Sequence, residues 1–287
     1  MEDELLRELY PEIRQLDRMS IRGICFSNAQ IVITQCWAVI NDRPTKWACQ
    51  RRNWPLWARR WPIPSESTMS RRLRTSSVEA LLDQLEHRTR HRLPSYWQKS
   101  IDAKPLPIGG WSRDPDARWG QAVKTKAKGY KFFAIVDAGG AVDSWTVGPM
   151  NGSEPLIARD MIKQLEPGGY LLGDALYDSN ALYELASERG WQLVAPRKKP
   201  KTGLGHRRHS AHRLRSIELL ETGSLFGRAL YHRRTSIEST FGTMGNVGGG
   251  LGPLPNWVRR LPRVRRWVQI KVILHHVRLA HPTRLAA

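Results

Sequence analysis

The spacing of hydrophobic residues changes near residue 97, and this change predicts two domains. Before it, apolar residues recur at helical spacing over Glu2–Met19 and again over Ser27–Ile40. After it come short apolar runs separated by glycine and other turn-forming residues, as expected for β-strands. We therefore expect a mainly helical N-terminal domain, residues 1–96, followed by a strand-rich domain, residues 97–287.

The second domain is predicted to alternate strands and helices. Its expected strands are residues 100–108, 130–136, 141–147, 170–173 and 191–195. The turn Asp137–Gly140 joins the second and third of these strands as a hairpin. Helices are expected over 154–165, with Ser153 as N-cap, and over 180–190. This order predicts an α/β fold, with a mixed five-stranded sheet flanked by helices.

Two basic segments follow these elements. Residues 197–230 break the alternation with the runs Arg197–Lys201 and Gly203–His209, which we interpret as an inserted basic loop and helix facing DNA. A solvated loop is the plainer alternative. The last segment, about Pro262–Leu279, is predicted to be a basic helix that completes the second domain.

The charge of the chain favours a polyanionic partner. Its 287 residues carry a formal net charge of +20, and the 46 Lys and Arg residues are spread along the whole sequence. Double-stranded DNA is the simplest partner, and an anionic membrane surface is less favoured because no long amphipathic pattern is present. No apolar run reaches the roughly 18 residues needed to span a bilayer, and the N-terminus does not resemble a signal peptide. We expect a cytoplasmic, nucleoid-associated protein with reduced cysteines.

A candidate DNA-reading segment lies in the first domain. Ser65 is placed to cap a short helix, 65–73, and the basic residues Arg71, Arg72 and Arg74 follow in its later turns. A helix, a proline-containing turn and a basic helix together resemble a helix-turn-helix, although an ordinary basic surface is an alternative. Just before it, tryptophans at 54, 57 and 61 are interpreted as one buried helical face rather than a platform for stacking bases.

Three carboxylates are candidates for the chemistry. Asp102 lies on the first predicted strand of the second domain, and Asp174 directly follows the fourth. Glu238 is the only acid among eleven Arg and Lys residues between Thr222 and the C-terminus. If the first and fourth strands are neighbours, as in the ribonuclease H arrangement, both aspartates reach one place and a crossing helix can add Glu238. Oxygen ligands of this kind suit Mg²⁺.

The residues around these carboxylates resemble a known family. Ile101–Leu106, Leu172–Ser179 and Tyr231–Glu238 are similar to the three blocks of bacterial insertion-sequence DDE transposases. The last block contains the family signature of Tyr, two residues, Arg, three residues and Glu, and it is the most specific. One position departs from the pattern, because Gly245 stands where the family often has Lys.

The resemblance implies a ribonuclease H-like catalytic domain that cuts and joins DNA strands. It implies that Asp102, Asp174 and Glu238 bind two Mg²⁺ ions, with Mn²⁺ as a substitute. Tyr231 and Arg234 would contact phosphates at the element's end, and another residue such as Arg233 or Arg260 could replace the missing Lys. A homodimer on DNA is expected, because the element has two ends that must be paired.

Alternatives remain open at each of these residues. Glu238 could simply pair with a neighbouring guanidinium, Asp102 could be a solvent-facing carboxylate of an edge strand, and Asp178 could replace Asp174 as ligand. Asp137 and Asp143 also lie near strands, although turn capping explains Asp137. For the whole chain, a catalytically inactive DNA-binding derivative and a structure-specific nuclease of the same fold are the competing functions.

Overall fold

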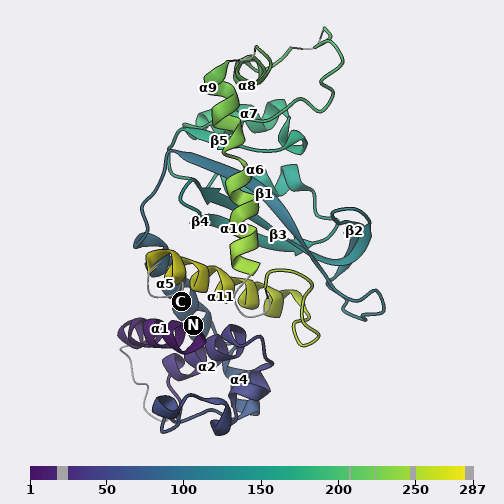
Figure 1. The fold of residues 1–287 in the computed structure, drawn as a ribbon. Helices are drawn as coiled ribbons and strands as arrows, with labels where there is room; N and C mark the ends of the chain where they lie inside the picture. The colour runs from purple at the N-terminus through teal and green to yellow at the C-terminus, as the bar shows by residue number, and fades with distance from the viewer. Residues whose placement is uncertain (18–24, 207, 223, 246–249, 282–287) are drawn as a thin grey trace. The chain divides into compact units, whose positions relative to one another are not determined.

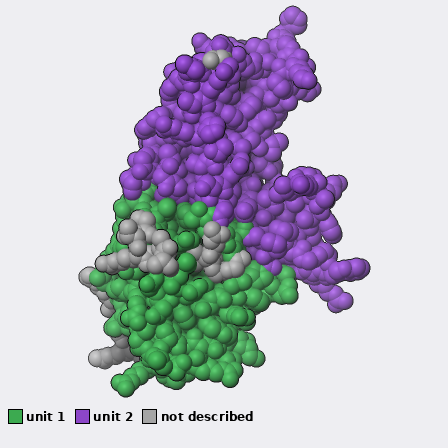
Figure 2. Space-filling view, viewed as in Figure 1, with its two compact units in different colours: residues 1–93, 243–251, 255–287 green, residues 94–242, 252–254 purple. Residues whose placement is uncertain are grey.

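The chain divides into two compact units. The computed structural model describes residues 1–17, 25–206, 208–222, 224–245 and 250–281. One unit comprises residues 1–93, 243–251 and 255–287, and the other comprises residues 94–242 and 252–254 (Figure 2). The first boundary thus lies close to the predicted position at 96. The C-terminal segment was expected in the second domain, but it groups with the first unit.

The first unit is helical. Its elements are the helices α1 (Glu2–Leu16), α2 (Asn28–Ile40), α3 (Thr45–Ala48), α4 (Glu66–Arg72), α5 (Ser76–His91) and α11 (Leu261–Ala280), with the 3₁₀ turns η1 (Arg51–Asn53) and η2 (Leu56–Ala58). The helix predicted over Glu2–Met19 ends at Leu16, and residues 18 and 19 lie outside the described residues. Ser27 and Gln30 form a capping box that begins α2.

The C-terminal helix α11 belongs to this unit because its apolar residues are buried there. It packs against α1, α2 and α5. Gln269 fixes the contact with α5, since its amide donates to Asp83 at 2.8 Å and to Glu86 at 3.0 Å. Most of the middle and end of α11 is buried, including the adjacent His275 and His276. A helix buried on several sides has no single apolar stripe, so its sequence does not indicate which domain it joins.

The tryptophan-rich segment is not α-helical, and Trp57 and Trp61 are only partly buried, so the predicted buried helical face is wrong. Prolines on both sides of η2 limit the segment to 3₁₀ turns. Trp54 is buried and its indole donates to the carbonyl of Ala48 at 2.6 Å. Trp57 donates to Asp3 at 2.5 Å, and Trp61 stacks on Tyr10 with ring centroids 4.0 Å apart. These indoles therefore serve the core of the unit.

The second unit is built on one mixed sheet of six strands (Figure 1). The strands are β1 (Gln98–Pro107), β2 (Arg118–Gln121), β3 (Lys126–Asp137), β4 (Val142–Pro149), β5 (Tyr170–Leu172) and β6 (Gln192–Val194). Their order is β2-β3-β1-β5-β6, and β4 also pairs with β3. Pairs among β1 to β4 are antiparallel, whereas β5 is parallel to β1 and β6. All five predicted strands are present, and the short β2 is additional.

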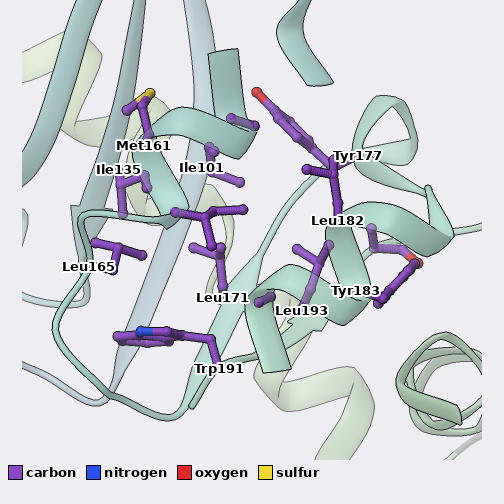
Figure 3. Close-up of a cluster of buried hydrophobic side chains, with 14 of the residues drawn as sticks. Ile101, Ile135, Met161, Leu165, Leu171, Tyr177, Leu182, Tyr183, Trp191 and Leu193 are labelled. Carbon is purple, nitrogen blue, oxygen red and sulfur yellow. The ribbon is translucent and has the colours of Figure 1, made fainter. Parts of the chain in front are cut away.

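Helices cover both faces of this sheet. They are α6 (Glu154–Ile162), α7 (Asn180–Glu188), α8 (Ala211–Glu221), α9 (Leu225–His232) and α10 (Thr235–Gly245), with the 3₁₀ turn η3 (Ala175–Tyr177). On one face, strand residues such as Ile101 and Leu171 pack against Met161 of α6 and Tyr183 of α7 (Figure 3). On the other face, Leu172 packs against Leu230 of α9. The sheet is thus the middle of three layers.

The basic insertion contains two helices, α8 and α9, where one was expected. Ser153 stands at the N-cap position of α6 as predicted, although its side chain makes no capping hydrogen bond there. In the part of the chain that the structure describes, no helix combines the length and apolarity needed to cross a membrane.

Candidate active site

The register of two parallel strands places Asp102 and Asp174 at the same level. Ser100 on β1 pairs with Leu172 on β5, and each aspartate lies two residues beyond its paired position. β1 lies between β3 and β5, so Asp102 is not on an edge strand. The two carboxylates interact electrostatically, because Asp174 contributes to raising the pKa of Asp102. The structure therefore brings these two predicted residues together.

Arg234 connects the third carboxylate to this pair. Its guanidinium donates to Asp102 at 3.3 Å and to Glu238, one helical turn further along α10, at 2.9 Å. Both Arg234 and Asp102 are largely buried, whereas the Glu238 side chain is mostly exposed. Glu238 does pair with a neighbouring guanidinium, as the simpler interpretation expected. The same guanidinium also holds Asp102, so the pair belongs to the carboxylate site.

Burial makes Asp102 unusually basic. Its pKa is raised to about 6, mainly by desolvation and to a smaller extent by the nearby carboxylates Asp174 and Glu154. Two contacts act in the opposite direction, namely the Ala103 amide, which donates at 2.7 Å, and the charge of Arg234. The site therefore carries more negative charge than its surroundings stabilise, which is the condition under which a cation binds well.

Two tyrosines fix the segment that carries Asp174. The Tyr231 hydroxyl donates to the carbonyl of Gly173 at 3.3 Å. Tyr177 is buried against the same glycine, where an added Cβ would lie only 2.8 Å from its ring. Asp174 itself begins η3 by accepting the amide of Leu176 at 2.8 Å. The family resemblance implies a phosphate contact for Tyr231, and the observed hydrogen bond also positions the segment that carries Asp174.

The competing acids have structural partners. Asp178 accepts two bonds from the guanidinium of Arg213, at 2.7 and 2.9 Å, and one from the amide of Lys198. Burial raises the pKa of Asp178, but these bonds outweigh it and the pKa falls below its ordinary value. Asp137 caps the β3–β4 turn, and Asp143 pairs with Lys99 at 2.6 Å.

Two further residues near the site were not predicted. Glu154, the first residue of α6, pairs with Lys131 of β3 at 2.7 Å and acts on the pKa of both Asp102 and Tyr177. Lys104 lies two residues beyond Asp102 on the same face of β1, with its ammonium 5.8 Å from the ring of Phe241 on α10. Lys104 could have been identified from the sequence, because residues two apart on a strand point to the same face of the sheet.

The donor set fits a divalent hard cation. Asp102, Asp174 and Glu238 offer only oxygen, the ligand type that Mg²⁺ prefers. Among the described residues, no three acidic, histidine or cysteine side chains already stand close enough to enclose an ion. Arg234 instead supplies the positive charge between two of the carboxylates. A divalent cation in place of this guanidinium would match the two negative charges that the single guanidinium only partly offsets.

The predicted DNA-binding residues of the first unit differ in exposure. Arg71 and Arg74 are exposed on and just after α4. Arg72 is partly buried, and its guanidinium donates to the carbonyl of Phe26 at 2.9 Å and to Asn28 at 2.5 Å. Ser65 caps α4 through the amide of Thr68, as predicted. Arg72 therefore anchors α4, and the two flanking arginines are the ones available to a partner.

Comparison with known proteins agrees with this geometry. The family model of the transposase DDE domain matches residues 94–252, which is more than half of the chain. The chain belongs to this family. The DDE transposase chain also aligns with the cryo-EM structure of a piggyBac transposase synaptic complex with hairpin DNA. That alignment covers 99% of this chain and 73% of the other, with a TM-score of 0.55 and 12% identity.

The structural likeness confirms the fold of this DDE transposase. At 12% identity it shows architecture alone, and that architecture is the predicted ribonuclease H-like sheet with flanking helices. No curated protein sequence matches the transposase chain significantly.

Proposed function

We propose that this transposase hydrolyses a phosphodiester at each end of an insertion sequence and then joins the exposed 3′-hydroxyl to target DNA. Asp102, Asp174 and Glu238 are the proposed ligands of two Mg²⁺ ions, with Mn²⁺ as a substitute. The observation that supports the proposal is the link of Asp102 to each of the other two carboxylates. Strand register places the two aspartates together, and Arg234 links Asp102 to Glu238.

Each residue has a defined task in this reaction. The three carboxylates hold the ions, and Tyr231 keeps Asp174 in place through the carbonyl of Gly173. Two bound divalent ions would stabilise the negative charge on the attacking and the leaving oxygen of an in-line displacement. Water is the nucleophile for cleavage, and the 3′-hydroxyl is the nucleophile for joining.

Arg234 is proposed to have two successive partners. Without DNA it pairs with Asp102 and Glu238. A guanidinium released from these carboxylates would be free to turn to a phosphate of the DNA, for which its planar donors are well suited. This exchange is consistent with the phosphate contact that the family resemblance implies for Arg234.

Double-stranded DNA is the proposed partner, held by cations around the site. Lys104 and Arg233 flank the carboxylates, and Arg233 also donates to Gln98 at the beginning of β1, at 3.5 Å. The insertion adds a hollow of about 470 Å³, whose lining includes Lys198, Lys199 and Arg213. In the first unit, Arg71 and Arg74 are proposed to contact the element ends. We further propose a homodimer on DNA, located at the nucleoid.

Purified protein incubated with its own flanking DNA tests the proposal. The substrate is a duplex that carries the inverted repeats bordering the coding region, with Mg²⁺ present or chelated. Cleavage and joined products are expected only with Mg²⁺. Asp174→Asn or Glu238→Gln should reduce both by at least about 100-fold, because several kcal/mol of charge stabilisation is lost.

Other outcomes identify the competing functions. DNA binding without cleavage under any metal condition indicates an inactive DNA-binding derivative. Hydrolysis that never gives joined products indicates a structure-specific nuclease. Full activity in either carboxylate variant contradicts the assigned site.

A further inference from the structure

Residues 109–128 form an arm at one end of the sheet in the second unit. The arm contains the loop after β1, the strand β2 and the first residues of β3. Within this unit, β2 lies at the opposite end from α8 and α9 (Figure 1). We propose that this arm is a second DNA-binding element, which holds duplex DNA at a distance from the cut. The inference rests on the proposed function of the carboxylate site.

The arm exposes large apolar side chains. Trp111 is 100% exposed, Val123 82% and Trp119 57%. Gly110, the neighbour of Trp111 in the chain, lies beside Trp119, since a Cβ added there would be 3.6 Å from the Trp119 ring. A protein keeps indoles in contact with water at a cost in free energy, and clusters of exposed aromatic side chains mark interaction surfaces.

The arm is nevertheless held in a defined conformation. The buried Tyr130 donates to Asp114 at 2.8 Å, and Lys128 donates to the carbonyl of Ser112 at 2.6 Å. Gly120 approaches the sheet so closely that a Cβ there would lie 2.5 Å from the carbonyl oxygen of Met150. The exposed rings therefore sit on a fixed support, which reduces the entropy lost when a partner binds.

The charge of the arm identifies the partner. It contains five cationic residues and two aspartates, a net charge of +3. Its exposed cations are Arg113, Arg118, Lys124 and Lys126. Asp114 points inward to Tyr130, so its negative charge is removed from the surface. Cations interleaved with exposed aromatic rings match the phosphates and bases of a nucleic acid.

Strand geometry gives the distance of this contact from the cut. Asp102 and Pro107 lie on the same strand, five residues apart, which is roughly 17 Å at the rise of a β-strand. Because B-DNA rises about 3.4 Å per base pair, the arm would meet the duplex about five or more base pairs from the scissile phosphate. Duplexes shortened within that distance on the side of the arm should lose this contact.

Two double variants test the arm by fluorescence anisotropy with a fluorescein-labelled, mixed-sequence DNA duplex. Trp111→Ala/Trp119→Ala should weaken binding by about fivefold or more, because the contact area of two exposed indoles with the duplex is removed. Lys124→Gln/Lys126→Gln should lower the slope of log K against log salt by about 1.8, since two phosphate contacts are lost.

Matched controls come from α6, in the same unit. Leu156→Ala removes another largely exposed apolar side chain, and Arg159→Gln/Lys163→Gln makes the same change in net charge. Neither control should alter binding as the arm variants do. Circular dichroism and thermal unfolding confirm that each variant folds.

The results separate the arm from the proposed function. Arm variants that bind DNA with wild-type affinity and salt slope overturn the inference, while Mg²⁺-dependent cleavage by the same proteins leaves the proposed function intact. Loss of affinity in the tryptophan variant with an unchanged salt slope in the lysine variant also overturns it. Failure of the wild-type protein to bind or cleave any duplex contradicts the proposed function itself.

Discussion

Arg234 donates a hydrogen bond to Asp102 across a separation of 132 residues in the chain. The same guanidinium pairs with Glu238, so one cation is shared by two of the three proposed ligands. Burial lowers the pKa of Arg234, but the surrounding Tyr231 and carboxylates outweigh this effect and the pKa rises above its ordinary value. Arg234 therefore stays charged and competes with any metal for the carboxylates.

This competition predicts opposite effects of Arg234→Ala on metal binding and on catalysis. Removal of the guanidinium leaves Asp102 and Glu238 without their internal cation, so Mg²⁺ should raise the melting temperature more than in the wild type. Strand cleavage should fall, because the proposed phosphate contact is lost. Arg233→Ala, at the adjacent position, is the matched control and should leave the Mg²⁺-dependent shift unchanged. Equal shifts in all three proteins would contradict the competition.

The buried carboxyl of Asp102 should make the fold less stable at neutral pH than at acidic pH. Its pKa rises from 3.8 in the unfolded chain to about 6 in the fold, so the folded state binds the proton more tightly. The resulting stabilisation is complete below pH 4 and is lost as the pH rises through 6. Asp102→Asn should therefore increase the free energy of unfolding at pH 8 by up to about 3 kcal/mol.

Chemical denaturation with a chelator present measures this effect. The gain from Asp102→Asn should shrink as the pH is lowered towards 4. A difference between variant and wild type that is constant with pH would show that Asp102 has an ordinary pKa.

Asp174 and Asp178, four residues apart, should respond differently to the same substitution. Asp174→Asn should abolish Mg²⁺-dependent cleavage with little loss of stability, because the hydrogen bond that its side chain accepts comes from the local Leu176 amide. Asp178→Asn breaks the ion pair with Arg213 and should lower the free energy of unfolding by about 3 kcal/mol. Because the pKa of Asp178 is lowered in the folded state, its ionised carboxylate stabilises the fold at neutral pH. This stabilisation is lost as the pH falls and the carboxylate is protonated.

Cleavage by the Asp178→Asn protein, assayed below its melting temperature, distinguishes the two roles. Retained Mg²⁺-dependent cleavage supports a structural role, whereas loss of cleavage in a folded protein would make Asp178 a ligand.

The arginines of α4 should separate into one structural and two binding residues. Arg72→Gln removes two bonds that tie α4 to Phe26 and Asn28, and it should cost about 2 kcal/mol of stability. Arg71→Gln and Arg74→Gln should leave the melting temperature unchanged, because both side chains are exposed. Each should instead weaken binding to the element end and reduce its salt dependence. The opposite pattern in unfolding and anisotropy measurements would reassign Arg72 to the DNA surface.

Local pattern predicted most of the second unit. The strands of the β3–β4 hairpin and the parallel strands β5 and β6 were visible as apolar runs between turns. β2 was missed because Arg118–Gln121 has one apolar side chain and a glycine, so it lacks the alternation of a half-buried strand. Its pairing depends on β3, whose extension to Lys126 provides the neighbouring edge.

The part of the site that depends on the order of the strands could be predicted from the sequence. Asp102 and Asp174 could be placed together because parallel neighbours bring equivalent positions to one level. The bond from Arg234 to Asp102 and the approach of Glu154 depend on packing between distant segments, which spacing does not encode. The C-terminal helix was assigned to the wrong domain for a similar reason. It is buried on several sides, so its apolar residues do not form one stripe that would indicate its partner.

The parallel ladder between β1 and β5 is only three residues long. Loss or gain of one residue before Asp174 would turn its side chain to the opposite face of the sheet, because side chains alternate along a strand. Insertions in the exposed loop 199–206 do not change the number of residues in β5 and leave the orientation of Asp174 unaffected. Evolution of this enzyme should therefore permit length variation in its basic loop while holding the number of residues in β5 constant.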